Sequence, residues 1–167
     1  MLSLRRAGGG GGAEVARVLN TMGQVYADLQ RYDEALASYA DALAALGAAA
    51  AGGEEAAAAA GERDEGSDPY AAAVHASVAR CQQSLGRYRE AEAAYLRALA
   101  VQRARCAGRE ELAVAQTLEE LSGVCGVMGR YGEAAGRLEE ALEIRRRVLE
   151  PGSLAVPQGA LGLAALL

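Results

Sequence analysis

Apolar and small residues recur at helical spacing in three similar stretches of the chain. When the stretches are aligned on Tyr32, Tyr88 and Tyr131, an alanine pair seven residues apart falls at the same offset in each. Seven residues are two helical turns, so each pair forms a narrow stripe that a neighbouring helix can approach closely. Each stretch therefore predicts an amphipathic helix. The flanking large apolar residues are Tyr39/Leu43, Tyr95/Leu99 and Leu138/Leu142.

A second helical pattern precedes each tyrosine, and a short break separates the two patterns. In the first stretch this pattern comprises Leu19, Met22, Gly23 and Tyr26. Glycine suits a helix end in the left-handed conformation. Each unit is therefore expected to be a helix, a tight turn and an antiparallel helix. The three breaks are Gln30-Arg31, Gly86-Arg87 and Gly129-Arg130.

These units resemble the tetratricopeptide repeat. The resemblance rests on the Gly23/Tyr26 pair, the alanine pairs, the turn tyrosines, and the small residues Ala79 and Ser122 at the position of Gly23. The chain departs from the pattern where Gln82 and Cys125 replace Tyr26 and where Leu138 replaces an aromatic residue. The resemblance implies an all-α, right-handed α-solenoid of three helix-turn-helix hairpins plus one lone C-terminal helix.

The repeat spacing is longer than usual for this family. Tyr88 and Tyr131 are 43 residues apart, and Leu112–Gln116 recurs 42 residues later as Leu154–Gln158, whereas the ordinary period is about 34 residues. The longer unit is similar to the repeats of kinesin light chains and of nephrocystin-type and signalling-ATPase arrays.

The expected organisation is a sequence of six segments. They are a disordered glycine-rich leader (1–12), a hairpin (13–46), a low-complexity Ala/Gly/Glu insertion (47–67), a second hairpin (68–107), a third hairpin (108–150) and the first helix of an incomplete fourth repeat (151–167). Met1–Ala7 also has features of an organelle presequence. The apolar end formed by Leu161, Leu163, Leu166 and Leu167 indicates either a fragment of a longer array or an end-to-end contact with a partner or second copy.

Composition argues against several classes of partner. The formal net charge of -5 and the pI near 5.0 disfavour nucleic acid. No apolar run approaches the roughly 18 residues of a membrane span. The arginine runs, such as Arg145–Arg147, are interleaved with glutamates and fit a solvated helix face better than an anion-binding patch. Three cysteines without metal-ligand spacing fit reduced, packed thiols in an intracellular compartment. We therefore expect a cytoplasmic protein, associated with the cytoskeleton or cilium.

Catalytic constellations are absent from the sequence. The single histidine, His75, excludes multi-histidine metal sites, and the lack of lysine excludes a phosphate-binding loop of the Gly-Lys-Ser/Thr type. His75 fits a packing residue better than a catalytic base, and Tyr32, Tyr88 and Tyr131 are interpreted as hairpin packing residues. The protein is therefore expected to be no enzyme and to need no metal or cofactor.

The resemblance implies a groove lined by the first helices of successive hairpins, which receives an extended or helical peptide. The implied groove residues are Arg17, Asn20, Gln24, Asp28, Arg80, Gln83, Gln116 and Glu119. The two arginines suit acidic side chains of a ligand, and the amides suit its backbone. The alternative is that these residues are only solvated helix faces. Asn20 and Gln24 replace the Lys and Asn of the chaperone-binding clamp, which disfavours carboxylate binding of that type.

The function that follows is a non-catalytic protein-interaction scaffold with a protein or peptide partner, similar to the cargo and adaptor array of a kinesin light chain. The competing interpretation is the regulatory array of a larger signalling ATPase or other enzyme, whose catalytic domain lies outside this chain.

Overall fold

The computed structural model describes residues 11–51, 69–105 and 111–149, and these residues form six helices. No strand occurs in these three ranges. Residues 1–10 of the predicted leader, 52–67 of the low-complexity insertion, Cys106 and the segment 150–167 with its apolar end lie outside the described residues, whereas residues 11–12 and 47–51 are helical. The helices are α1 (Gly11–Asp28), α2 (Tyr32–Ala51), α3 (Pro69–Ser84), α4 (Tyr88–Arg105), α5 (Glu111–Val127) and α6 (Tyr131–Val148).

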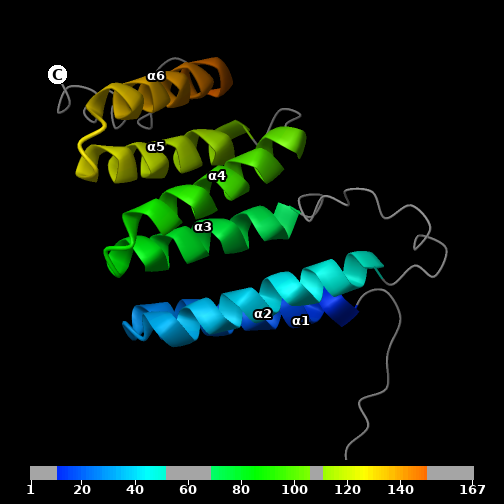
Figure 1. Cartoon of the computed structure of the whole chain (residues 1–167). Helices are drawn as coiled ribbons and strands as arrows, with labels where there is room; N and C mark the ends of the chain where they lie inside the picture. Colours follow the sequence, from blue (N-terminus) through cyan, green and yellow to red (C-terminus); the bar gives the residue numbers. More distant parts are fainter. Residues whose placement is uncertain (1–10, 52–68, 106–110, 150–167) are drawn as a thin grey trace, which may run out of the picture.

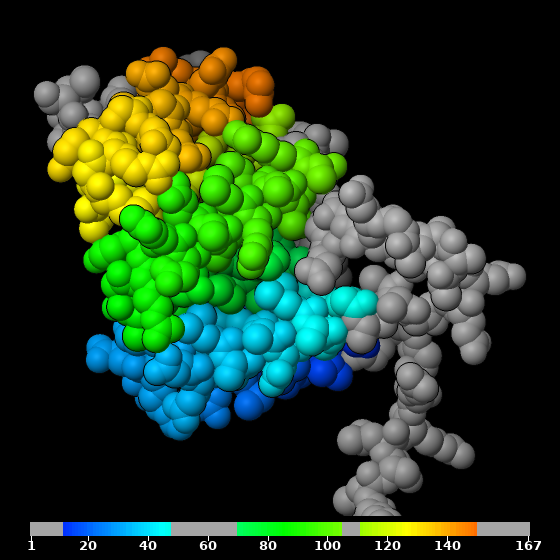
Figure 2. All heavy atoms as spheres, in the orientation of Figure 1, coloured from blue at the N-terminus to red at the C-terminus, as the bar shows by residue number. Residues whose placement is uncertain are grey.

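Consecutive helices pair into three hairpins that stack in sequence order (Figure 1). α1 packs on α2, α3 on α4 and α5 on α6, while the α2–α3 and α4–α5 contacts join one hairpin to the next. The hairpins form successive layers of the molecule (Figure 2). The predicted all-α helical repeat fold is confirmed. None of the described helices has both the length and the apolar character that crossing a bilayer requires.

The three turns within the hairpins share one backbone geometry. Gln30, Gly86 and Gly129 adopt φ values of 60°, 73° and 77°. Each donates its amide to the carbonyl three residues earlier, and the next residue donates to the carbonyl five residues earlier. This pair of bonds satisfies carbonyls that a helix end otherwise leaves open. The left-handed turn expected from the glycines is confirmed, and the first hairpin makes it with a glutamine.

The alanine pairs lie at the centre of the hairpin packing. All six alanines are 0% exposed, because each second helix presses this stripe against its neighbours. Tyr39 and Tyr95 are buried beside the stripe, and Leu138 is buried at the same position of the third hairpin. Small side chains thus set a close helix-helix distance, and the large side chains beside them fill the remaining space.

Two expectations about single residues have different outcomes. Cys81 and Cys125 are buried free thiols, as expected, and burial raises the pKa of Cys81. Tyr32 and Tyr88 are half-buried, but Tyr131 is 58% exposed. The interpretation of Tyr131 as a hairpin packing residue is therefore wrong, since most of its side chain faces solvent.

Candidate protein-interaction groove

A pocket of about 470 Å³ lies where the first two hairpins meet. Three helices supply its lining, which comprises Gln24, Ala27, Asp28, Tyr32, Tyr39, Ser77, Arg80, Cys81 and Ser84. Gln24, Asp28, Arg80 and Ser84 are exposed, whereas Tyr39 and Cys81 are buried. The pocket therefore has an apolar floor and a polar rim. Burial raises the pKa of Tyr39, which keeps its hydroxyl protonated and able to donate.

Arg80 lies between this pocket and a second polar cluster. Its guanidinium donates to the Ser77 hydroxyl at 3.1 Å, and it makes no ion pair within 4 Å with any described residue. Its positive charge acts to lower the pKa of Tyr39 in the pocket and of Glu120 in the second cluster. An exposed guanidinium without a carboxylate partner retains donors for a ligand.

Glu120 of α5 lies in the second cluster, beside Tyr95, Gln116 and Arg80. Burial raises the pKa of Glu120, while the Arg80 charge and hydrogen bonding with Tyr95 and Gln116 act in the opposite direction. The Tyr95 hydroxyl donates to Gln83 Oε1 at 3.4 Å, so Gln83 belongs to the same cluster. We use "groove" below for the pocket together with this cluster.

The structure brings five of the eight predicted residues to the groove. Gln24, Asp28 and Arg80 line the pocket, and Gln83 and Gln116 lie in the second cluster. Arg17 is exposed, pairs with Glu14 at 3.2 Å and borders a different hollow on α1.

Asn20 and Glu119 occupy equivalent positions of α1 and α5, and both are engaged within the helix stack. Asn20 is 5% exposed and donates its side-chain amide to the Tyr70 hydroxyl at 3.1 Å. Glu119 accepts from Arg145 Nε at 2.6 Å and from Nη2 at 3.0 Å. Neither lines the pocket.

Residue spacing explains why Glu120, which the sequence did not single out, lies in the groove. Successive helical residues are about 100° apart, so Glu120 points away from the direction of Glu119. Counted from the turn tyrosines, Glu120 is equivalent to Ser77, which lines the pocket. The sequence does contain a signal for Glu120. Ser77 is three residues before Arg80 and shares its helix face, so the equivalent of Ser77 in α5 is expected on the groove as well.

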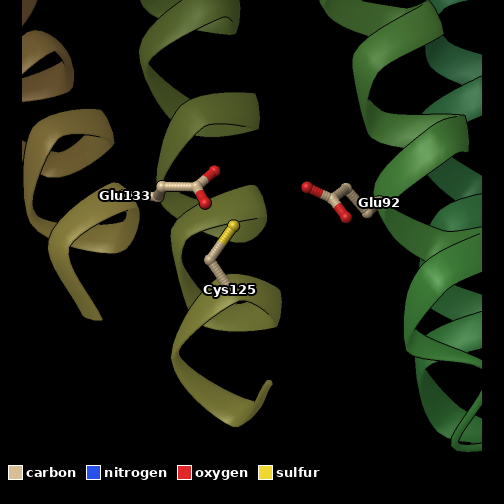
Figure 3. Close-up of side chains that lie close together, drawn as sticks. All are labelled: Glu92, Cys125 and Glu133. Carbon is tan, nitrogen blue, oxygen red and sulfur yellow. The ribbon is translucent and has the colours of Figure 1, made fainter. Parts of the chain in front are cut away.

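A separate group of polar side chains, outside the groove, consists of Glu92, Cys125 and Glu133 (Figure 3). Their potential ligand atoms lie within 4.8 Å of one another. Arg130 Nη1 lies 2.8 Å from both oxygens of Glu92, and its Nε lies 2.7 Å from Glu133. One guanidinium thus bridges both carboxylates, and Arg137 Nη2 lies 3.8 Å from Glu133 as a second cation. This group is an ion-pair network that joins the second and third hairpins.

Comparison with known proteins agrees with the repeat geometry. Three tetratricopeptide repeat models match residues 16–45, 74–107 and 114–155. The three matches together cover more than half of the chain. The chain is a tetratricopeptide repeat protein. No curated protein matches the sequence of this tetratricopeptide repeat protein at a significant level.

Several solved structures share the fold. BtubC (BKLC) from P. vanneervenii aligns with a TM-score of 0.76 at 20% identity, over 98% of this chain and 58% of that one. The first TPR of Spaghetti (RPAP3), bound to the HSP90 peptide SRMEEVD, gives 0.62 at 19% identity, over 92% and 94% of the two chains. A Podosopora anserina protein described as a kinesin light chain with nearly identical TPR-like repeats gives 0.68 at 17% identity, over 94% and 67%. This chain thus spans a little over half the length of BtubC.

Proposed function

We propose that this tetratricopeptide repeat protein is a non-catalytic scaffold that binds a peptide segment of another protein in its groove. The observation that supports this most directly is Arg80, an exposed guanidinium without an ion-pair partner among the described residues, beside a pocket of about 470 Å³. Peptide recognition requires donors and acceptors that the free protein leaves available together with a concave surface that excludes water. The groove has both features.

The charges around Arg80 restrict the ligand. Asp28 lies in the pocket on one side of Arg80, and Glu120 lies in the second cluster. A run of several acidic residues would meet these carboxylates, and like charges that face each other disfavour binding. A segment with one acidic side chain at Arg80, and with its backbone hydrogen-bonded by Gln24 and Gln116, fits better. The C-terminal carboxylate clamp of chaperone-binding relatives is not proposed, because the chain has no lysine to form it.

Within the family, we propose the type of array found in kinesin light chains. The 43-residue spacing of Tyr88 and Tyr131 supports this, together with the repeat match that extends over residues 114–155. Recovery of a kinesin heavy chain with the protein would support the assignment, and its absence from every capture would contradict it. The regulatory array of a larger signalling ATPase remains the second candidate, favoured by the same spacing and decided by a nucleotide-binding domain in the same transcript.

The experiment that tests groove binding is selection of random 12-residue peptides on the full chain, followed by affinity measurement. Wild-type protein is expected to select peptides with one acidic residue at a fixed position. Arg80→Glu is expected to lose their binding, because the substitution replaces an attraction by a repulsion. Arg97→Glu makes the same charge change at an exposed position of α4 outside the pocket and serves as the control. Equal binding by the wild-type and Arg80→Glu proteins would contradict the proposal.

A further inference from the structure

The outer face of α1, continued by Leu29 in the turn that follows, exposes a continuous apolar stripe. Val15, Val18, Met22, Val25 and Leu29 are 52%, 59%, 44%, 52% and 60% exposed. Their spacing alternates between three and four residues, which keeps all five on one face of a helix. A hollow of about 550 Å³ bordered by α1 residues runs along this face. We call these five residues the α1 stripe.

The same register positions are covered in the other two hairpins. Counted from the turn tyrosines, Val18 corresponds to Val74 and Thr117, which are 0% and 3% exposed. Val25 corresponds to Cys81 and Val124, which are 3% and 0% exposed. The face that is open on α1 is therefore the face that α3 and α5 bury against the preceding hairpin.

The internal interfaces show what kind of surface covers this face. Val74 and Cys81 share a core cluster with Tyr39 and Leu46 of α2. In the next interface, Leu121 and Val124 share a cluster with Tyr95 of α4. In both cases the cover is a single helix lying along the stripe. The α1 stripe is half of the same kind of interface, and no helix among the described residues covers it.

A second copy of the chain offers a matching face. Apart from the α1 stripe, the described residues expose three large apolar side chains, Leu96, Val127 and Tyr131, and these lie on three different helices. On α6, at the other end of the stack, Leu138 and Leu142 are buried and not available. Among the described residues, the remaining continuous apolar stripe of suitable length is the α1 stripe of another copy.

We propose that two copies of this protein associate through α1 packed antiparallel on α1, with the two-fold axis at Met22. Unbroken three-four spacing of apolar residues is the pattern with which two helices form a continuous packed face. An antiparallel arrangement centred on Met22 places residue 17 opposite residue 27 of the second copy, which brings Arg17 within one residue of the level of Asp28, whereas a parallel arrangement brings Glu14 level with Glu14. Opposite charges at the edge of the interface favour the antiparallel orientation. No member of the α1 stripe lines the pocket of the groove.

Sedimentation velocity over a range of protein concentrations tests the association. The wild-type chain is expected to shift from monomer to dimer as its concentration rises. Met22→Glu is expected to weaken association by about 100-fold or more, because both copies would place a carboxylate in an apolar contact. Leu96→Glu, at a side chain 43% exposed on α4, is the matched control and is expected to dimerise like the wild type. Thermal unfolding of both variants verifies that they fold.

Disulfide trapping tests the orientation, in a Cys106→Ser background that leaves the buried Cys81 and Cys125. Met22→Cys is expected to form a disulfide that joins position 22 of the two copies. A mixture of Val15→Cys and Leu29→Cys is expected to give mainly the mixed disulfide. A chain that stays monomeric at every concentration would overturn the proposal, and so would homodimers of Val15→Cys formed in preference to the mixed species. The groove experiment does not depend on this outcome, since it reads peptide binding at Arg80.

Discussion

Gly23 of α1 lies directly against the ring of Tyr39 of α2. A Cβ atom built at position 23 would stand 2.4 Å from Cε1 of Tyr39, 2.7 Å from Cδ1 and 2.9 Å from Cζ. The ring is 1% exposed and belongs to the core cluster shared by the first two hairpins. The absence of a side chain at position 23 therefore lets the two helices of the first hairpin approach with an aromatic ring between them.

Gly23→Ala is expected to destabilise the protein by about 1 to 3 kcal/mol, because a buried ring has little room to move when a core position gains a methyl group. Urea unfolding followed by circular dichroism measures the change. Gly136→Ala in α6 is the control, since a Cβ there meets nothing within 4 Å. That variant is expected to gain about 0.5 to 1 kcal/mol from helix propensity. A Gly23→Ala protein as stable as the wild type would show that Tyr39 can shift.

In the left-handed turn of the first hairpin, a substitution is expected to raise the stability of the protein. Gln30 holds a φ of 60° with a full side chain, whereas Gly86 and Gly129 occupy the equivalent positions of the other hairpins. Gln30→Gly is expected to stabilise the protein by up to about 1 kcal/mol, because it removes the steric cost of a Cβ in this region. Gly86→Ala is expected to cost at least as much. Thermal unfolding midpoints of the two variants should therefore move in opposite directions, and a shared direction would refute the explanation.

The fold was predictable because its determinants are local and repeated. Alanine pairs seven residues apart and a break before the arginine of each turn, with glycine in two hairpins and Gln30 in the first, specify helix, turn and helix without reference to the rest of the chain. Repetition in three stretches indicates stacking, since one hairpin cannot bury both of its faces. The exposure of Tyr131 was not predictable in this way, because the pattern gives the helix and not the neighbours that cover each side chain.

The groove was predictable only to the level of a helix face. Asn20 and Glu119 are polar residues next to groove positions, and a shift of one residue turns a side chain by about 100°. Which of two adjacent glutamates enters the groove depends on contacts with other helices. Glu119 accepts hydrogen bonds from Arg145 of α6, while Glu120 lies within the influence of the Arg80 charge on α3, and these arginines are 26 and 40 residues away in the sequence.

Substitution by glutamine is expected to have opposite effects on stability at the adjacent residues Glu119 and Glu120. Burial raises the pKa of Glu120 above that of the unfolded chain, so its charged form opposes folding at neutral pH. Glu120→Gln is expected to raise the free energy of unfolding at pH 7, and the gain should disappear as the pH falls below the unfolded pKa of glutamate. Denaturant unfolding at a series of pH values measures both.

Glu119→Gln provides the comparison at the neighbouring position. Its carboxylate accepts two hydrogen bonds from Arg145, and the two side chains are 23% and 14% exposed. The substitution is expected to cost about 1 to 2 kcal/mol at pH 7, because hydrogen bonds between charged and largely buried groups are among the stronger ones. If both variants lost stability at pH 7, Glu120 would be held by Arg80 more strongly than its burial opposes it.

The arginines at the starts of α2 and α6 occupy the same register position but have different partners. Arg31 pairs with Glu34 of the helix that it precedes, whereas Arg130 pairs with Glu133 of the helix that it precedes and also with Glu92 of the preceding hairpin. Arg130→Met is therefore expected to lower the thermal midpoint more than Arg31→Met does. Loss of Arg130 leaves Glu92, whose side chain is 16% exposed, without its ion-pair partner, while Glu133 keeps Arg137 at 3.8 Å. An uncompensated, largely buried charge such as that of Glu92 is costly.

A double-mutant cycle separates the inter-hairpin pair from the local one. In a Glu92→Gln background, Arg130→Met should cost no more than Arg31→Met, because the bond to Glu92 is already lost and only the pair within α6 remains. The pH dependence provides a second check. The Arg130 guanidinium lowers the pKa of Glu133, so the stability contributed by this pair is present above the unfolded pKa of glutamate and is lost as the pH falls through the lower folded value. An equal cost of Arg130→Met in both backgrounds would mean that the Glu92 contact contributes nothing to the joining of the second and third hairpins.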